Sequence, residues 1–272
     1  MWDSLLENCS RDRLEKYLGK VAEDQLAAEF LYVANQKVSE SLYPLISILE
    51  VSLRNRVHTK LTEKFGAVDW WNHDELNIQA FTSCNDKIER AKSKIYHRTS
   101  AITNKHNIKA SQLVAEVSLN FWTSLFSEDL SKVLWSDLMT CFPHLPKEAR
   151  KRRSVAKPLE NIKSLRNRVM HHEPILFDES ALPSTLHSKG SDLLSWMSVE
   201  MASWLTKRDR FQTVWEEYQV VLMQMHIWLE CRVKVKAARE SRNAQALQAS
   251  YDAVKREKLK FDELANKYLC NT

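Results

Sequence analysis

The sequence predicts an all-α protein. Its 272 residues include only three glycines and six prolines, and 44% of them are hydrophobic. Few positions are therefore suited to tight turns and strand kinks, which is typical of helical proteins. Along most of the chain, apolar residues also recur at spacings of three and four, which places them on one side of a helix. A chain of this length can bury one large core or two modest ones.

Residues 1–40 are predicted to form two helices, with a stop near Gly19 between them. The next helix should begin at Ser41, whose side chain can cap it, with Pro44 in the first turn, where a missing N–H costs nothing. It is expected to end at about Phe65, because the apolar stripe stops there. The residues of this stripe are Ile46, Leu49, Leu53, Val57 and Leu61.

A loop is predicted at residues 66–73, with Trp70 and Trp71 packing over the helix ends. A polar helix should come next and run to about Arg98, before a connector at residues 99–110. The inward positions of the polar helix are expected to be Ile78, Phe81, Ile88, Ala91 and Ile95.

Residues 113–126 are apolar nearly all round, so we predict a single helix at the centre of the fold. A short helix to about Met139 should come next. Turn-forming residues predict a loop at 174–190, and two helices are expected at 191–204 and 209–229.

The end of the chain differs in composition from the rest. His226 lies among apolar residues, which favours a hydrogen-bonded interior histidine over a ligand. From Arg232 onward the chain is rich in alanine, lysine and arginine, with sparse apolar positions. We therefore predict one helical domain at residues 1–230 and a terminal helical appendage at residues 231–272.

Residues 158–176 are the most informative stretch for function. Their apolar stripe consists of Ile162, Leu165 and Val169. At about 100° per residue, Asn167 and His171 fall roughly opposite this stripe, and Arg166 falls on the flank. The helix should end just before Pro174, because a residue that precedes proline disfavours the helical conformation. A guanidinium and an imidazole are thus expected on a rigid, outward-facing scaffold.

An arginine, a polar residue and then a histidine near the end of a helix resemble the signature of HEPN ribonucleases. The longer run LRNRVMHHEPI at residues 165–175 is similar to the Abi-like branch, the AbiD/AbiF-type proteins of phage defence. Three other stretches, at residues 48–58, 69–71 and 113–127, fit the same branch. Together they span most of residues 40–180.

The resemblance implies a HEPN-type helical bundle with additional N-terminal and C-terminal helices. It also implies a metal-independent endoribonuclease, acting in abortive infection or as the toxin of a toxin–antitoxin system. Arg166, Asn167 and His171 would be catalytic, as a histidine suits proton transfer and an arginine stabilises extra charge on phosphorus. The supporting groups would be His172, Glu50 and Arg54.

Other interpretations remain open. The run LRNRVH at residues 53–58 echoes LRNRVMHH at 165–172, but its histidine lies one residue too close to Arg54 for the family pattern. Glu50 and Arg54 could form an ordinary surface ion pair. Likewise, a helix end with arginine, asparagine and histidines can be only a polar terminus. The whole chain could be a non-catalytic RNA-binding module or an inactive dimeric scaffold.

A dense basic stretch at residues 146–157 leads into the motif. Its cations are Lys147, Arg150, Lys151, Arg152, Arg153 and Lys157. Such clusters attract phosphate, and their binding weakens as salt is added. RNA contact is favoured over a plain basic linker, although the net charge of +5 alone is too mild to indicate a nucleic-acid partner.

The expected partners are an RNA substrate and a second copy of the chain, because the family joins two Arg/His sets in one cleft across a two-fold axis. An antitoxin protein or RNA is a further possibility. We expect no cofactor and no metal site, since the consecutive side chains of His171, His172 and Glu173 diverge. The charged N-terminus and the lack of a long apolar run predict a soluble, cytoplasmic protein with no membrane segment.

Overall fold

The computed structural model describes residues 2–98, 108–178, 182–240 and 244–270. Helices account for 81% of the structure, and the described residues contain no strand, so the predicted all-α fold class is confirmed. Within the same residues, no helix combines the length and the apolar character needed to cross a bilayer. The expected connector at 99–110 lies mostly outside the described residues.

The chain forms two compact units: Met1–Ser41 with Arg210–Thr272, and Leu42–Asp209. The helices of the first unit are α1 (Trp2–Cys9), α2 (Arg11–Leu18), the first part of α3 (Gln25–Phe65), α11 (Phe211–Glu240) and α12 (Ala244–Cys270). The predicted boundary between residues 230 and 231 falls inside α11.

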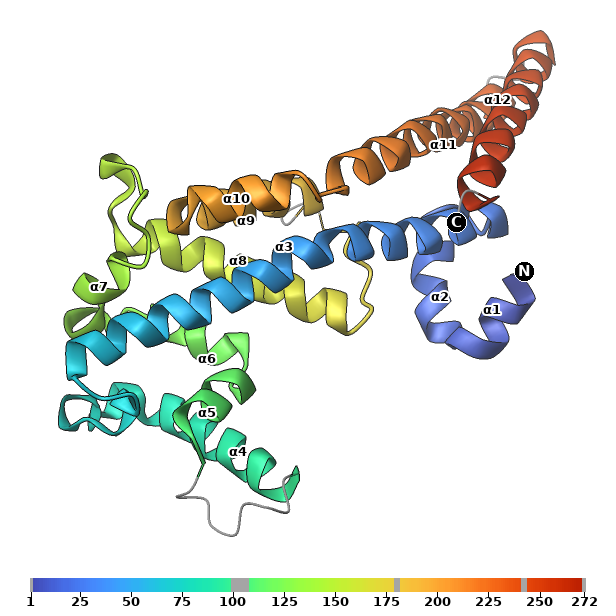
Figure 1. Ribbon diagram of the computed structural model, residues 1–272. Coiled ribbons are helices and arrows are strands. Elements are labelled where there is room, and N and C mark those ends of the chain that lie inside the picture. Colours follow the sequence, from blue (N-terminus) through green and yellow to red (C-terminus); the bar gives the residue numbers. More distant parts are fainter. Residues whose placement is uncertain (1, 99–107, 179–181, 241–243, 271–272) are drawn as a thin grey trace. The chain divides into compact units, whose positions relative to one another are not determined.

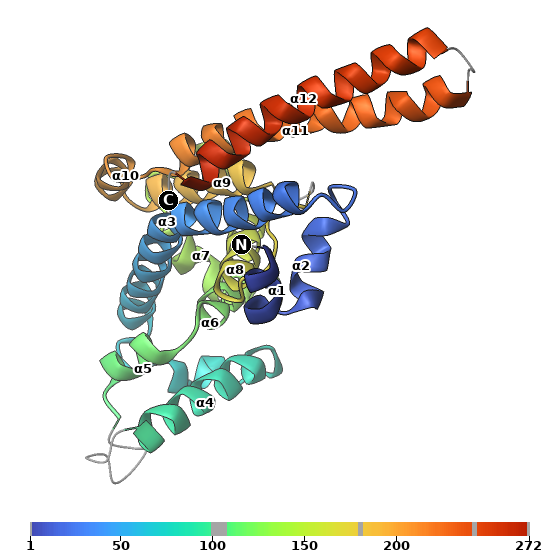
Figure 2. The ribbon, with the colours of Figure 1, turned by 90° about the vertical axis from the view of Figure 1, so that its right-hand side faces the viewer.

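In the first unit, α11 and α12 lie side by side as a long helical hairpin (Figures 1 and 2). Phe30 of α3 joins this hairpin, because its ring packs 6.0 Å from that of Tyr218, 6.1 Å from that of Phe261 and 5.3 Å from that of Tyr268. An aromatic cluster therefore forms the core of this unit.

The second unit contains the rest of α3 and seven further helices: α4 (Thr82–Arg98), α5 (Ala110–Glu116), α6 (Leu119–Ser124), α7 (Ser131–Met139), α8 (Arg152–Met170), α9 (Pro183–Met197) and α10 (Val199–Thr206). Short 3-10 turns connect them: η1 (Trp70–Asn72), η2 (Asp74–Leu76), η3 (Gln79–Phe81) and η5 (Lys147–Ala149). Figure 1 shows α8 crossing behind α3.

Close packing of three helices positions the candidate site. A Cβ atom added at Gly190 of α9 would lie 2.9 Å from Leu45 Cδ2 of α3 and 3.1 Å from Ile162 Cδ1 of α8. A larger residue at this position would force the side chains of Leu45 and Ile162 to shift, so glycine suits this close approach. At the other end of α3, the buried Trp70 ring stacks 6.2 Å from Phe121 and meets Trp71 edge-on at 5.4 Å. Trp70 also donates its indole N–H to His58 of α3, so contacts hold this part of α3 at both ends.

Two predicted helix boundaries were wrong because packing outweighed local signals. The helix expected to start at Ser41 is part of α3, which runs unbroken through Pro44. The missing hydrogen bond is tolerated because residues on both sides, including Leu42 and Leu45, are fully buried. The single helix expected at 113–126 breaks at Val117, which is extended and ends α5 before α6 begins.

Further expectations also differ from the structure. The loop expected at 174–190 contains the start of α9, where Pro183 occupies the first turn. Ile78 and His226, both expected inside, are exposed, because each lies on the outer side of its segment. The helix that carries the motif stretch 158–176 already begins at Arg152, inside the predicted basic stretch. This last difference matters most, because it joins part of the basic stretch to the motif helix.

Candidate active site at the end of α8

α8 has a buried face and an exposed face along its whole length. The buried residues are Val155, Leu159, Ile162, Leu165 and Val169. The exposed positions opposite them are Arg153, Lys157, Glu160, Ser164, Asn167 and His171. Their spacings of four and three keep them on one side of the helix over about 27 Å, at 1.5 Å per residue. Two cations, an amide and an imidazole therefore share one surface.

α8 ends in a Schellman motif immediately after Met170. The N–H of His172 donates to Val169 O at 3.1 Å, and the N–H of Glu173 donates to Arg168 O at 2.9 Å. His172 adopts φ 55, the left-handed conformation that glycine usually supplies at this position. The predicted end just before Pro174 is thus three residues late, since the capping hydrogen bonds stop the helix first.

Arg168 secures the segment immediately after α8. Its Nη1 lies 3.0 Å from Asp178 Oδ2, its Nη2 donates to Pro174 O at 2.5 Å, and its Nε lies 3.8 Å from Glu173 Oε2. Sequence reasoning assigned Arg168 no leading role. The sequence did offer a signal for this role, namely the acidic residues Glu173 and Asp178 just beyond the helix. A cation in the last turn of a helix can bind carboxylates and carbonyl groups of the segment that follows it. Arg168 therefore positions the segment that carries His171 and His172.

The motif arginine lies against α3. Arg166 Nε is 3.4 Å from Glu50 Oε2, and 31% of the Arg166 side chain remains exposed. Arg54 is one turn further along α3 from Glu50, on the same face of that helix. The structure thus brings Glu50 and Arg166 into contact, with Arg54 next along α3.

Two buried guanidinium nitrogens at this place have unused donors. Among the described residues, neither Arg54 Nε nor Arg166 Nε has a hydrogen-bond partner of good geometry. The Glu50 carboxylate is close enough to Arg166 for an ion pair, but the angle does not make a hydrogen bond. A buried N–H group without a hydrogen bond costs free energy. Each of the two arginines can therefore gain by donating to a further acceptor.

The structure separates the motif arginine from the motif histidine within one copy of the chain. Asn167 and His171 are both exposed, and the His171 N–H donates to Asn167 O at 2.9 Å. Within the part of the chain that the structure describes, no hydrogen bond or ion pair joins Arg166 to His171. Arg166 turns toward α3, whereas His171 faces away from the core, because the two positions differ by five residues, or about 140° around the helix.

The predicted basic stretch divides into two groups. Arg152 is structural, because it donates to Phe126 O at 2.9 Å and pairs with Glu128 at 3.1 Å. Arg150 is exposed but donates to Leu145 O at 3.4 Å. The remaining cations, Lys147, Lys151, Arg153 and Lys157, are exposed. Of these cations, Arg153 and Lys157 share the outward face of α8 with Asn167 and His171.

His58 has a structural role that its sequence context did not reveal. Its Nδ1 accepts the indole N–H of buried Trp70 at 3.1 Å, and its ring lies 6.2 Å from that of Trp71. Burial lowers the pKa of His58 below its usual value, which favours the neutral ring that this acceptor role requires. The two tryptophans of the aromatic loop could have indicated this role, because a buried indole N–H needs a hydrogen-bond acceptor and His58 can supply one.

A second histidine contact, His187 Nε2 with Asp209 Oδ2 at 2.6 Å, was also not predicted. It ties α9 to the segment after α10. Across residues 2–98, 108–178, 182–240 and 244–270, no three histidine, cysteine, aspartate or glutamate residues lie close enough together to hold a metal ion.

Comparison of the chain with protein-family models, curated proteins and solved structures found no match. The all-α class and the candidate site on α8 therefore stand on the chain's own residues.

Proposed function

We propose that the protein is a metal-independent endoribonuclease of the HEPN type, with its active site at the end of α8. The observation that carries this proposal is the exposed face of α8, where Arg153 and Lys157 lead to Asn167 and His171. Cations along one face suit a phosphate backbone, and a histidine at its end suits proton transfer. Abortive infection or toxin activity in the cytoplasm, restrained by an antitoxin protein or RNA, is the role we propose for it.

In the proposed reaction, His171 takes the proton of a ribose 2′-hydroxyl, and the 2′ oxygen attacks the adjacent phosphorus. The bond to the 5′ oxygen breaks, and an acid returns a proton to that leaving group. The charge that builds on the phosphate is stabilised by Arg166, whose ion pair with Glu50 at 3.4 Å leaves the two Nη groups as donors for phosphate oxygens. Asn167 orients the phosphate or His171, whereas His172 serves mainly the helix cap.

One copy holds Arg166 and His171 apart, which favours a site built from two copies. In a two-fold dimer each surface meets its own equivalent, so the ends of two α8 helices can supply two histidines and two arginines to one cleft. A pair of histidines provides the base and the acid together. This proposal requires the exposed face around Asn167 and His171 to lie beside the dimer axis.

His171→Ala is the direct test, with cleavage and binding of a labelled RNA measured separately in EDTA. We expect a loss of cleavage of about 100-fold or more, with RNA affinity and thermal unfolding retained, since His171 is exposed and its loss leaves no cavity. Asn55→Ala, at the exposed asparagine of the other LRNRV run, is the matched control and should cleave normally. Equal cleavage by His171→Ala and the wild type would reject the assignment.

One observation favours a second candidate, a helical RNA-binding module that does not cut. Arg166 is already paired with Glu50, and no described contact joins it to His171. Such a module would bind RNA through Arg153 and Lys157 with an affinity that falls as salt rises. RNA binding without any cleavage by the wild-type protein would support this candidate instead.

A further inference from the structure

α11 has an exposed stripe that runs beside its contact with α12. The stripe consists of Glu216, Val220, Met223, Ile227, Glu230 and Lys234. Three large apolar side chains form its centre, where Val220 is 53%, Met223 62% and Ile227 39% exposed. The α11 residues packed on α12, such as Trp228 against Phe261, are buried and lie on another side of the helix.

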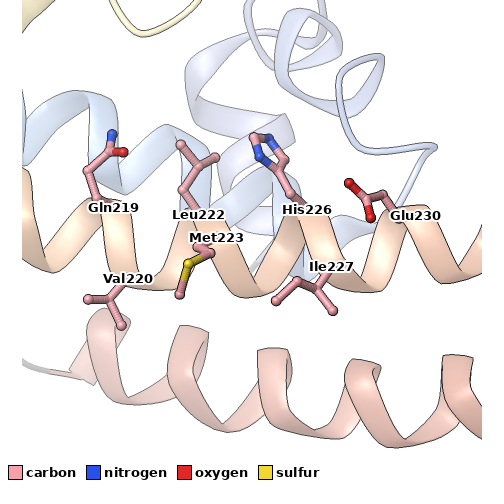
Figure 3. Close-up of a pocket in the computed structure, with 7 residues that line it drawn as sticks. All are labelled: Gln219, Val220, Leu222, Met223, His226, Ile227 and Glu230. Carbon is pink, nitrogen blue, oxygen red and sulfur yellow. The ribbon is translucent and has the colours of Figure 1, made fainter.

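The spacing of the stripe is that of a coiled-coil seam. Its residues are separated alternately by four and three positions, which is the heptad pattern of residues that face a partner helix. Figure 3 shows the side chains in two rows along the helix, with Val220, Met223 and Ile227 in one row and Gln219, Leu222, His226 and Glu230 in the other. A shallow groove of about 540 Å³ lies over these rows.

We infer that this stripe binds the same stripe of a second copy of the chain, with the two α11 helices antiparallel. The charges at the ends of the stripe identify the partner and its direction. Glu216 and Lys234 are equally far from Met225, nine residues on either side. An antiparallel copy centred on Met225 therefore places each Glu216 level with the partner's Lys234 over a seam of about 27 Å.

The same register buries the apolar centre. Met223 comes level with the partner's Ile227, and Val220 packs along the methylenes of the partner's Glu230, whose carboxylate stays at the edge. A parallel copy in register would instead place Glu216 beside Glu216 and Lys234 beside Lys234, which is unfavourable. The stripe is complementary to itself only in the antiparallel arrangement.

This interface is distinct from the one proposed at α8. It uses only residues of α11, so it can form whether or not the protein cleaves RNA. The two proposals are separated by substitutions in α11, which alter self-association without touching Asn167, His171 or the basic residues of α8.

The first experiment is sedimentation equilibrium of the full chain over nanomolar to micromolar concentrations. Met223→Glu should weaken the association step that α11 mediates by about 100-fold or more, because two carboxylates enter the apolar centre of that interface, whereas association through α8 would remain as a separate step. Leu259→Glu on α12 is the matched control, because Leu259 is 61% exposed and lies outside the stripe. It should associate like the wild type, and helical circular dichroism should show both variants folded.

Charge reversal tests the direction. Glu216→Lys and Lys234→Glu should each weaken association by about ten-fold, since each turns two attractive pairs into repulsive ones. The double variant should recover the wild-type affinity, because both pairs are restored with opposite sign. A monomeric wild type, unchanged association of Met223→Glu, or a double variant weaker than both single variants would overturn the inference.

Discussion

The run Leu-Arg-Asn-Arg-Val occurs twice in the chain, at residues 53–57 in α3 and 165–169 in α8. The two copies of the run have the same pattern of buried and exposed side chains. In both, the leucine and the valine are buried and the asparagine is exposed. In both, the first arginine has a buried Nε without a hydrogen-bond partner of good geometry among the described residues. The five shared residues therefore specify the same orientation on a helix.

The two copies differ in the conformation of the chain beyond the valine. α3 continues, so His58 turns toward Trp70 and accepts its indole N–H. α8 ends, so His171 and His172 stay exposed beside a capped terminus. Whether a histidine after this run supports the core or faces solvent thus depends on two things: its spacing from the valine, which is one residue in α3 and two in α8, and the place where the helix ends. This difference places the proposed active site on α8, and substitutions at equivalent positions of the two copies can test it.

The largest difference should come from the two equivalent arginines. We expect Arg166→Ala to reduce RNA cleavage by about 100- to 1,000-fold, as removal of one charge-stabilising donor does in other enzymes. Arg54→Ala should reduce it by less than about ten-fold, because Arg54 acts from the neighbouring helix. Single-turnover cleavage assays measure both. Equal losses would mean that the two copies contribute equally, and Arg166→Lys should not restore the rate, since lysine lacks the planar fork.

The two histidines should differ in their effect on stability. His58→Phe removes the acceptor of the fully buried Trp70 N–H, so the free energy of unfolding should fall by about 1–3 kcal/mol. His171→Phe changes an exposed residue and should alter it by less than about 0.5 kcal/mol. Urea unfolding followed by circular dichroism measures both values. A larger loss for His171→Phe would reverse the roles we assign.

The pH dependence of stability should reveal His58 as well. Its pKa is lower in the folded protein than in the unfolded chain, so the unfolded chain takes up a proton first as the pH falls. The wild type should have a larger free energy of unfolding than His58→Phe. This difference should be constant above about pH 6.5 and shrink as the pH falls below that value. Urea unfolding at pH 7.5 and pH 5.5 tests this. A difference that grows on acidification would contradict the neutral, buried ring.

The smallest effect is expected at the cap of α8. His172→Gly should raise the free energy of unfolding by about 0.5–1 kcal/mol, because glycine adopts the left-handed conformation without steric strain. RNA cleavage should stay within about three-fold of the wild type if His172 only caps the helix. Thermal unfolding and the cleavage assay together check this. A loss of cleavage as large as that of His171→Ala would make His172 part of the chemistry.

Sequence reasoning succeeded where burial alone decides the outcome. The stripe of Ile162, Leu165 and Val169 is buried, and the outward positions of Asn167 and His171 agree with the same 3.6-residue period. Trp70 and Trp71 are buried in the aromatic loop, as predicted. Helix periodicity is a local property, so a single sequence can reveal it.

The errors arose where distant packing overrides a local signal. Pro44 does not start a helix, because buried neighbours hold both sides of α3, and Gly190 does not end a loop, because α9 needs it to approach Leu45. The Glu50–Arg166 contact joins residues more than one hundred positions apart, and only the resemblance indicated it. The sequence also could not show that His171 lies just beyond the last helical residue, since capping geometry decides this.

The most direct test of a metal-independent nuclease site on α8 is the chemistry at the ends of RNA fragments produced by the wild-type protein in EDTA. Attack by the 2′-hydroxyl predicts a 2′,3′-cyclic phosphate on one fragment and a 5′-hydroxyl on the other, with both absent for His171→Ala. Fragments that carry a 5′-phosphate and a 3′-hydroxyl, or cleavage that stops when EDTA is added, would contradict this assignment.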